Sequence, residues 1–155
     1  MLINILYGLP TMAVCLLLES LLLLIALRYY VRREAMVKTA AFWSTLLVVN
    51  GVMLMLVIGN IAQIGIWALL LQMLGEFADF NTAFYHSAMN FATLGYGDIV
   101  MSNQYKLLGP LEAINGVLMI GVSTAVLMAV FQDAMKKTIQ ARLGKEGTWN
   151  VPRKD

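Results

Sequence analysis

Long apolar runs, separated by short polar segments, dominate the chain. The first extends from Ile5 to Leu27, the second from about Ala40 to Leu74, and the third from about Leu107 to Phe131. A helix of about 20 residues crosses a hydrocarbon core of about 30 Å, so each run is long enough to span a membrane. No Lys or Arg precedes the first run, and it is longer than the apolar part of a secretory signal, so we interpret it as a retained span.

A shorter apolar stretch, from Asn81 to Ala92, lies between the second and third runs. It is too short to cross a membrane, and a glycine-rich segment follows it, which is typical of a helix that enters the membrane and returns. Asp79 or Asn81 could cap its start. The pattern therefore predicts an all-α membrane protein with three transmembrane helices and one re-entrant helix.

The second run is too long for one simple crossing, because as a single helix it would measure about 50 Å. Trp43 and Trp67 lie about 36 Å apart along such a helix, which suits indole rings anchored at the two membrane interfaces. We therefore expect the segment 68–80 to lie at the outer surface.

Composition supports lipid as the solvent, since 60% of the residues are hydrophobic and 13% are charged, against about 25% charged in soluble domains. Cys15 is the single cysteine, so an intrachain disulfide is excluded and a packing role is expected. His86 is the single histidine, which argues against a transition-metal site. The basic residues form no patch for nucleic acid, and the spans offer no nucleophile, base and orienting partner for an enzyme.

The basic residues fall into two clusters. Four follow the first run, six follow the third run, and Lys106 alone lies between the second and third runs. With three spans both clusters lie on one side, and the positive-inside rule then predicts an outside N-terminus and a cytoplasmic C-terminus in the cell membrane. We expect contacts with anionic lipids at five of these residues: Arg28, Arg32, Arg33, Lys136 and Lys137.

Residues 93–98 read T-L-G-Y-G-D and directly follow the re-entrant helix. Gly95 and Gly97 can adopt positive φ without a steric penalty, so successive carbonyls can turn toward one axis. Carbonyl oxygens held in this way can replace the water around a dehydrated cation, and Thr93 adds a hydroxyl at the inner end.

These six residues resemble the potassium channel pore family, whose filters read T-V-G-Y-G-D or T-L-G-Y-G-D, and the resemblance extends over about 67–131. It implies K⁺ ions bound in stacked sites, with Leu94 and Tyr96 as outward struts and one filter per chain in a homotetramer with three identical subunits as partners. K⁺ is the only bound species we expect, with no cofactor. The implied ion-binding residues are Thr93, Leu94, Gly95, Tyr96 and Gly97, with Asp98 at the outer mouth.

Residues 116–125 resemble the inner helix of the same family. Gly116 lies at about the position of the family's hinge glycine, and Gly121 follows five residues later. Glycine in a membrane helix also permits close packing, so we weigh a hinge role and a packing role for Gly116 equally. Thr124 matches a hydroxyl that faces the cavity in the family, and Ser123 is the second candidate for the cavity or gate.

Some positions depart from the family pattern. Ala92 stands where many members have a second Thr, and Tyr85 and His86 replace a tryptophan pair on the pore helix. Met89 occupies the place of a Glu or Val behind the filter, so we hypothesise that Tyr85 hydrogen-bonds Asp98 instead. We favour a packed or hydrogen-bonded His86 over a proton sensor, which its intrinsic pKa would also allow.

Two carboxylates lie within the apolar runs. Glu19 is in the middle of the first, where an ionisable group costs at least about 2.5 kcal/mol unless it is paired or wet. We favour a hydrogen bond to Asn50, Asn60 or Gln63, and the alternative is a gate linked to pH or lipid. Glu112 could brace the back of the pore helix, which we favour, or face water.

The sequence therefore predicts a subunit of a potassium-selective ion channel, resembling a small prokaryotic member with one extra N-terminal helix. A less selective cation channel and a nonconducting accessory subunit are the alternatives, and the gating stimulus is open. We divide the chain into an N-terminal helix with a basic loop, a pore domain and a short basic tail: 1–39, 40–135 and 136–155. Within the pore domain we expect an outer helix, a pore helix, a filter and an inner helix at 40–74, 81–92, 93–98 and 107–135.

Overall fold

The chain folds into three long helices and one short helix. The computed structural model describes the backbone of residues 1–33 and 42–149, and the side chains of 1–33 and 43–141. The helices are α1 (Leu2–Arg32), α3 (Phe42–Met73), α4 (Phe80–Phe91) and α5 (Leu108–Trp149). Three of them are long and apolar enough to cross a membrane, and no strand occurs in the described ranges, so the predicted fold class is confirmed.

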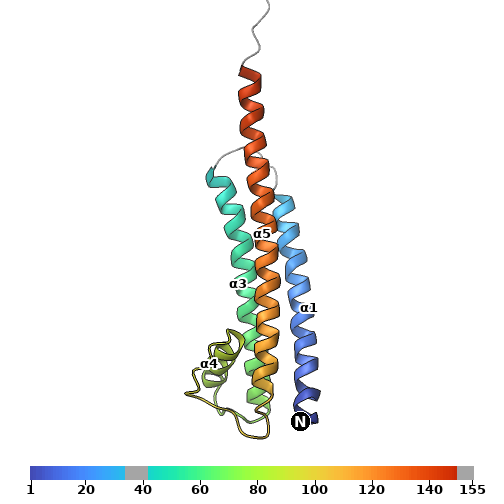
Figure 1. Ribbon diagram of the computed structural model, residues 1–155, viewed down its shortest axis with the longest axis vertical. Helices are drawn as coiled ribbons and strands as arrows, with labels where there is room; N and C mark the ends of the chain where they lie inside the picture. Colours follow the sequence, from blue (N-terminus) through green and yellow to red (C-terminus); the bar gives the residue numbers. More distant parts are fainter. Residues whose placement is uncertain (34–41, 150–155) are drawn as a thin grey trace, which may run out of the picture.

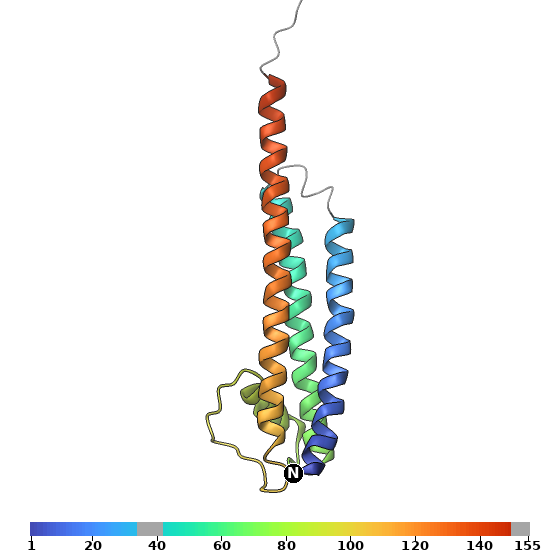
Figure 2. The ribbon, with the colours of Figure 1, turned by 45° about the vertical axis from the view of Figure 1, so that its right-hand side comes forward.

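The three long helices run side by side, and α4 lies at one end of the bundle together with the N-terminus (Figures 1 and 2). Helix α1 contacts α3 and α5 but not α4. Arg28 and Arg32 lie at the opposite end of the bundle, and Lys136 and Lys137 lie on the half of α5 that is also remote from α4. The described members of both basic clusters therefore share one end, as three spans require, while Lys38 lies outside the described residues.

Helix α3 is one continuous helix up to Met73, and the structure corrects the expected placement of Trp67 near its C-terminal end. Trp43 is largely exposed, as an interfacial anchor should be, but Trp67 is fully buried. Ala68 and Leu71 are also fully buried, so this part of 68–80 packs inside the protein. The reason is tertiary, because α4 and the N-terminal half of α1 cover the end of α3 that periodicity alone leaves exposed.

Helix α5 is longer than the inner helix expected from the sequence. It continues from Leu108 to Trp149, so most of the segment 136–155, expected as a tail, is helical. No Pro or Gly lies between Gly121 and Gly144, and nothing in that interval therefore interrupts helix propagation. Residues 150–155 lie outside the described chain.

Two apolar clusters fill the interior, one at each end of the bundle. Cys15, Trp67 and Met119 belong to the cluster at the α4 end, which confirms the packing role of the cysteine. Ala26, Leu56 and Val130 belong to the cluster at the basic end. On each long helix a buried polar residue separates the two clusters, and these residues are Glu19, Gln63 and Ser123.

Candidate functional site

Helix α4 begins at a side-chain cap. Asp79 accepts hydrogen bonds from the Thr82 backbone N–H at 2.9 Å and from the Thr82 hydroxyl at 2.6 Å, so Asp79 is the cap among the two predicted candidates. The Thr82 hydroxyl, followed by the Thr82 N–H, lowers the pKa of Asp79 below its usual value. A carboxylate at this end also complements the helix dipole, so the cap fixes where α4 starts.

Helix α4 ends at the start of the T-L-G-Y-G-D segment in a Schellman motif. The Thr93 N–H donates to the Asn90 carbonyl at 2.9 Å, and the Leu94 N–H donates to the Met89 carbonyl at 2.8 Å. The motif requires a left-handed residue, which is usually glycine, but here Thr93 takes that position with φ of 58°. A β-branched residue is strained there by about 1–2 kcal/mol, and the cap holds it in place.

The backbone of residues 93–97 alternates in conformation. Thr93, Gly95 and Gly97 have positive φ, whereas Leu94 and Tyr96 between them do not. In a regular strand successive carbonyls point to opposite sides, and the alternation of φ turns them toward one side instead. Among the described residues no hydrogen bond takes a carbonyl of residues 93–97 as its acceptor, so these oxygens are available to an external partner.

The side chains of this segment lie on the surface of the single chain. Leu94 is 52% exposed and Tyr96 is 68% exposed, although both are large and apolar. Within one chain they therefore do not pack as the struts expected from the sequence. Exposed apolar side chains of this size beside a functional backbone are typical of a surface that another protein surface covers.

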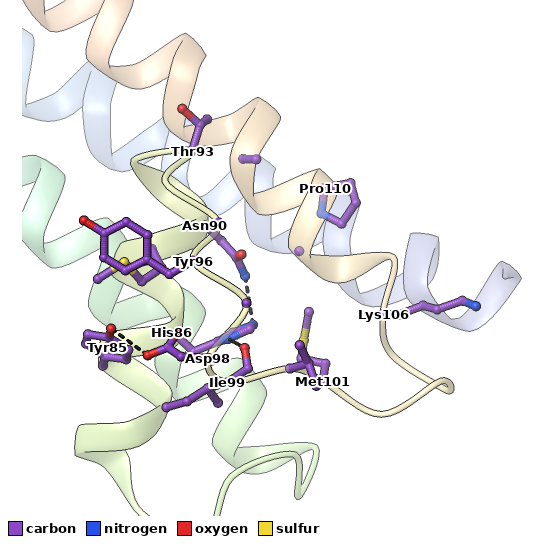
Figure 3. A pocket seen from close by; sticks show the side chains of 16 residues that line it. Tyr85, His86, Asn90, Thr93, Tyr96, Asp98, Ile99, Met101, Lys106 and Pro110 are labelled. Carbon is purple, nitrogen blue, oxygen red and sulfur yellow. Dashed lines mark hydrogen bonds between the residues drawn. The ribbon is translucent and has the colours of Figure 1, made fainter.

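Asp98, the last residue of the T-L-G-Y-G-D segment, is hydrogen-bonded to a side chain of α4. The Tyr85 hydroxyl donates to the Asp98 carboxylate at 2.8 Å, which confirms the hypothesised hydrogen bond (Figure 3). This bond raises the pKa of Tyr85, so the phenol stays protonated and remains a donor. Tyr85 and Met89 line a groove of about 450 Å³ between α4, the segment and the start of α5.

A second set of hydrogen bonds links α5, α4 and the chain beyond Asp98. Asn90 Nδ2 donates to Glu112 Oε2 at 3.2 Å and to His86 Nε2 at 2.9 Å. An accepting Nε2 leaves the imidazole proton on Nδ1, which lies 3.1 Å from the Ile99 carbonyl and donates to it (Figure 3). Glu112 thus braces α4, as expected, and Asn90 is a member of this hydrogen-bonded set that sequence reasoning missed.

Burial keeps His86 in its neutral form. Desolvation lowers the pKa of His86 below its usual value, against smaller opposing effects of the Ile99 carbonyl and of Asp98 and Glu76. Its low exposure and its hydrogen bonds to Asn90 and the Ile99 carbonyl show that His86 is packed and hydrogen-bonded, as favoured from the sequence. Asn90 lies four residues after His86 on the same face of α4, a spacing that could have pointed to the pair.

Glycine on α5 determines how closely α4 approaches. A Cβ added to Gly116 would lie 2.0 Å from the carbonyl oxygen of Phe91, the last residue of α4. The structure thus favours packing over a hinge for Gly116. Gly121 has no neighbouring atom within 4 Å of such a Cβ, and Thr124 is exposed nearby with its hydroxyl donating to the Ile120 carbonyl.

Ser123 is buried within the single chain, whereas its neighbour Thr124 is exposed. Its side chain is 6% exposed, and its hydroxyl donates to Glu19 Oε1 at 2.7 Å. Gln63 Nε2 donates to the other oxygen, Oε2, at 2.8 Å. Glu19 is therefore hydrogen-bonded to Gln63, one of its three predicted partners, and also to Ser123, which the sequence did not indicate.

The loop between residues 98 and 108 forms hydrogen bonds with α1 and with a residue just after α3. Sequence reasoning also missed these contacts. The Glu76 carboxylate, just after α3, accepts hydrogen bonds from the Ser102 N–H at 2.7 Å and from the Ser102 hydroxyl at 2.6 Å. Asn4 on α1 donates to the Gln104 carbonyl at 3.0 Å. Neither pair has a local pattern, because its members are far apart along the chain.

Comparison with known proteins identifies one related family. The family model described as "Ion channel" matches residues 52–133, which is more than half of the chain. The matched segment contains most of α3, all of α4, the T-L-G-Y-G-D segment and the first part of α5, and it leaves α1 outside. No curated protein and no solved structure matches the chain.

Proposed function

Because the chain belongs to the ion channel family, we propose that it is one subunit of a potassium-selective channel whose filter is residues 93–97. The observation that carries this proposal is the backbone of that segment. Its carbonyls accept no hydrogen bond from the described residues, and its φ angles alternate so that the oxygens turn the same way. A K⁺ ion loses its water only where such oxygens replace it.

The carbonyls of Thr93, Leu94, Gly95 and Tyr96, together with the Thr93 hydroxyl, are the proposed ligands of K⁺. One chain supplies one side of each ring of oxygens, so we propose that four identical subunits surround the ions. The exposed Leu94 and Tyr96 support this arrangement, since neighbouring subunits would cover them. The C-terminal end of α4 would add a favourable dipole for a cation below the filter.

The same proposal gives the chain an orientation. The described basic residues at the end away from the filter would lie in the cytoplasm of the cell membrane, with the N-terminus and the filter mouth outside. Arg28, Arg32, Arg33, Lys136 and Lys137 would then lie near anionic lipid headgroups. Gly121 and Thr124 would line the cavity, because they lie on an open face of α5.

Reconstitution of the purified chain alone tests the proposal. We expect single-channel currents in a defined bilayer, a bi-ionic reversal potential that strongly favours K⁺ over Na⁺, and fourfold symmetry with ordered ions between residues 93 and 97. Equal permeability for Na⁺ and K⁺ would indicate a less selective cation channel. Absence of current from correctly assembled protein would indicate an accessory subunit, and a different symmetry would remove the proposed filter.

A further inference from the structure

A buried carboxylate joins three helices at the middle of the bundle. Glu19 on α1 is 3% exposed, and each of its oxygens accepts one hydrogen bond, from Ser123 on α5 at 2.7 Å and from Gln63 on α3 at 2.8 Å. Both carboxyl oxygens of Glu19 are therefore occupied as acceptors, one from α5 and one from α3. The pore family does not explain this residue, because α1 lies outside the matched segment 52–133.

The donors around Glu19 form a short relay. Asn60 Nδ2 lies 3.5 Å from the Ser123 hydroxyl oxygen and donates to it, while the Ser123 hydroxyl donates to Glu19. Apolar clusters lie on both sides of this layer. Separating the pair would leave Glu19 Oε1 without a donor in a buried layer, while Gln63 still donates to Oε2, and an unsatisfied buried acceptor is costly.

The bond also fixes the rotation of α5. Ser123 and Thr124 are about 100° apart around the helix, with Ser123 turned to α1 and Thr124 on the open face. Any rotation or sliding of α5 that moves Thr124 must also move the Ser123 hydroxyl away from Glu19. Two further side-chain hydrogen bonds made by α1 lie near its two ends. The Tyr30 hydroxyl donates to Asp133 on α5 at 2.8 Å, and Asn4 donates to the Gln104 carbonyl in the loop before α5.

We propose that Glu19 is a positioning residue for α5, and that its hydrogen bond to Ser123 sets how often the pore is open. Helix α1 is then a regulatory element of the channel, acting from behind the helix that carries Thr124. The bond to Gln63 has a different role, since it anchors the carboxylate to α3 without restraining α5. This inference rests on the proposed channel function and adds a control element to it.

Two substitutions separate these roles in single-channel recordings of the full-length protein. Ser123→Ala and Gln63→Leu each remove one hydrogen bond from the same carboxylate, and Ser123→Ala also removes the acceptor of Asn60 Nδ2. We expect Ser123→Ala to change the open probability about tenfold, the effect of one lost buried hydrogen bond, and Gln63→Leu to leave it within about twofold. Unitary conductance and K⁺ selectivity should stay as in the wild type in both variants.

A double-mutant cycle tests whether Ser123 acts through Glu19. In a Glu19→Leu background, Ser123→Ala should have no further effect on the open probability. Glu19→Gln retains an acceptor for the Ser123 hydroxyl and Ser123→Thr retains the donor, so both should lie closer to the wild type. If Ser123→Ala fails to assemble, Glu19→Gln and Ser123→Thr still give the comparison with Glu19→Leu.

Lower tetramer yield with an unchanged open probability in Ser123→Ala, Glu19→Leu and Glu19→Gln would overturn the inference and leave Glu19 with a folding role only. Equal changes in Ser123→Ala and Gln63→Leu would also overturn it. The failure of the proposed function looks different, because the wild-type protein itself would then show no K⁺-selective current.

Discussion

Two helices of this protein end in the same hydrogen-bonding motif but with different residues at its left-handed position. At the end of α3, Gly75 donates to the Gln72 carbonyl and Glu76 donates to the Leu71 carbonyl, at 3.0 and 3.1 Å. At the end of α4, Thr93 and Leu94 make the equivalent bonds to Asn90 and Met89. The left-handed residue is Gly75 with φ of 76° in the first motif, and Thr93 with φ of 58° in the second.

The difference shows what each turn has to do. After α3 the chain only has to reverse, and glycine does this without strain. After α4 the same turn also starts the proposed filter, in which the Thr93 hydroxyl would be an ion ligand, and a strained threonine takes the place of glycine. Strain of this kind persists at functional sites only where the surroundings hold it, and here α4, α5 and Glu112 provide that support.

The largest effect is expected from a methyl group added to a left-handed glycine inside the filter. Gly95→Ala costs about 1–2 kcal/mol at its φ, and because four chains would contribute to one ring, the cost in the tetramer is about 4–8 kcal/mol. We expect K⁺-selective current to be lost. The measurement is the bi-ionic reversal potential together with the unitary current.

Gly75→Ala is the matched control, since a Cβ at either glycine meets no atom of the chain within 4 Å and both have positive φ. Gly75→Ala should lower the free energy of unfolding by about 1–2 kcal/mol per chain, the same as Gly95→Ala, but should keep K⁺ selectivity. Loss of selectivity in Gly75→Ala, or its retention in Gly95→Ala, would contradict the comparison of the two turns.

A smaller effect is expected where α5 supports the end of α4. Gly116→Ala places a methyl group against the Phe91 carbonyl, so the backbone must shift, at a cost of about 1–3 kcal/mol. Thermal dissociation of the tetramer measures this loss. Gly121→Ala has open space and should dissociate like the wild type, whereas a stable Gly116→Ala tetramer with altered gating would restore the hinge interpretation.

Acidification should loosen the α4 turn through His86. Because burial lowers the pKa of His86 in the folded protein, its stabilising contribution is complete above about pH 6.5 and is lost as pH falls toward the lower folded pKa. The temperature at which the proposed tetramer dissociates should be lower at pH 5 than at pH 7.5, by about 2–4 °C for each kcal/mol of stability lost. Asp98 and Glu76 also act on the ring, so His86→Gln is the control, and an equal pH response in that variant would assign the effect to other groups.

The smallest effects are expected at Thr93 itself. Thr93→Gly should relieve about 1–2 kcal/mol of strain and stabilise the turn, but weaken K⁺ binding because the hydroxyl is lost. Thr93→Ser keeps the hydroxyl and should bind K⁺ nearly as the wild type does. The K⁺ dependence of tetramer thermal stability measures both, and tighter K⁺ binding in Thr93→Gly would show that the hydroxyl does not contribute.

Much of the fold followed from the sequence, because apolar runs and short polar segments depend on local order along the chain. The three long helices, the short α4 and its Asp79 cap are of this kind. Trp67 was misplaced, since its burial depends on α4 and α1 folding over the end of α3. The end of α5 was also misplaced, because a switch to basic composition does not by itself stop a helix.

The candidate site also contains features that the sequence predicted and features that depend on tertiary contacts. The T-L-G-Y-G-D segment and the Tyr85–Asp98 hydrogen bond could be proposed from sequence, since these residues lie within 13 positions of one another. The roles of Asn90, Glu76 and Asn4 could not, because their partners come from other elements. The hydrogen bond of Ser123 to Glu19 could not be proposed either, because the two residues are 104 positions apart along the chain.

The sequence by itself indicated three apolar runs long enough to cross a membrane, a short helix between the second and third, and a glycine-containing segment after it, since these depend on hydropathy and on glycine. Only the tertiary structure decided that Gly116 packs on Phe91, that a strained Thr93 closes α4, and that Glu19 meets Ser123 across the bundle. The physical reason is that buried polar groups must find partners wherever packing brings them, and those partners can be a hundred residues away.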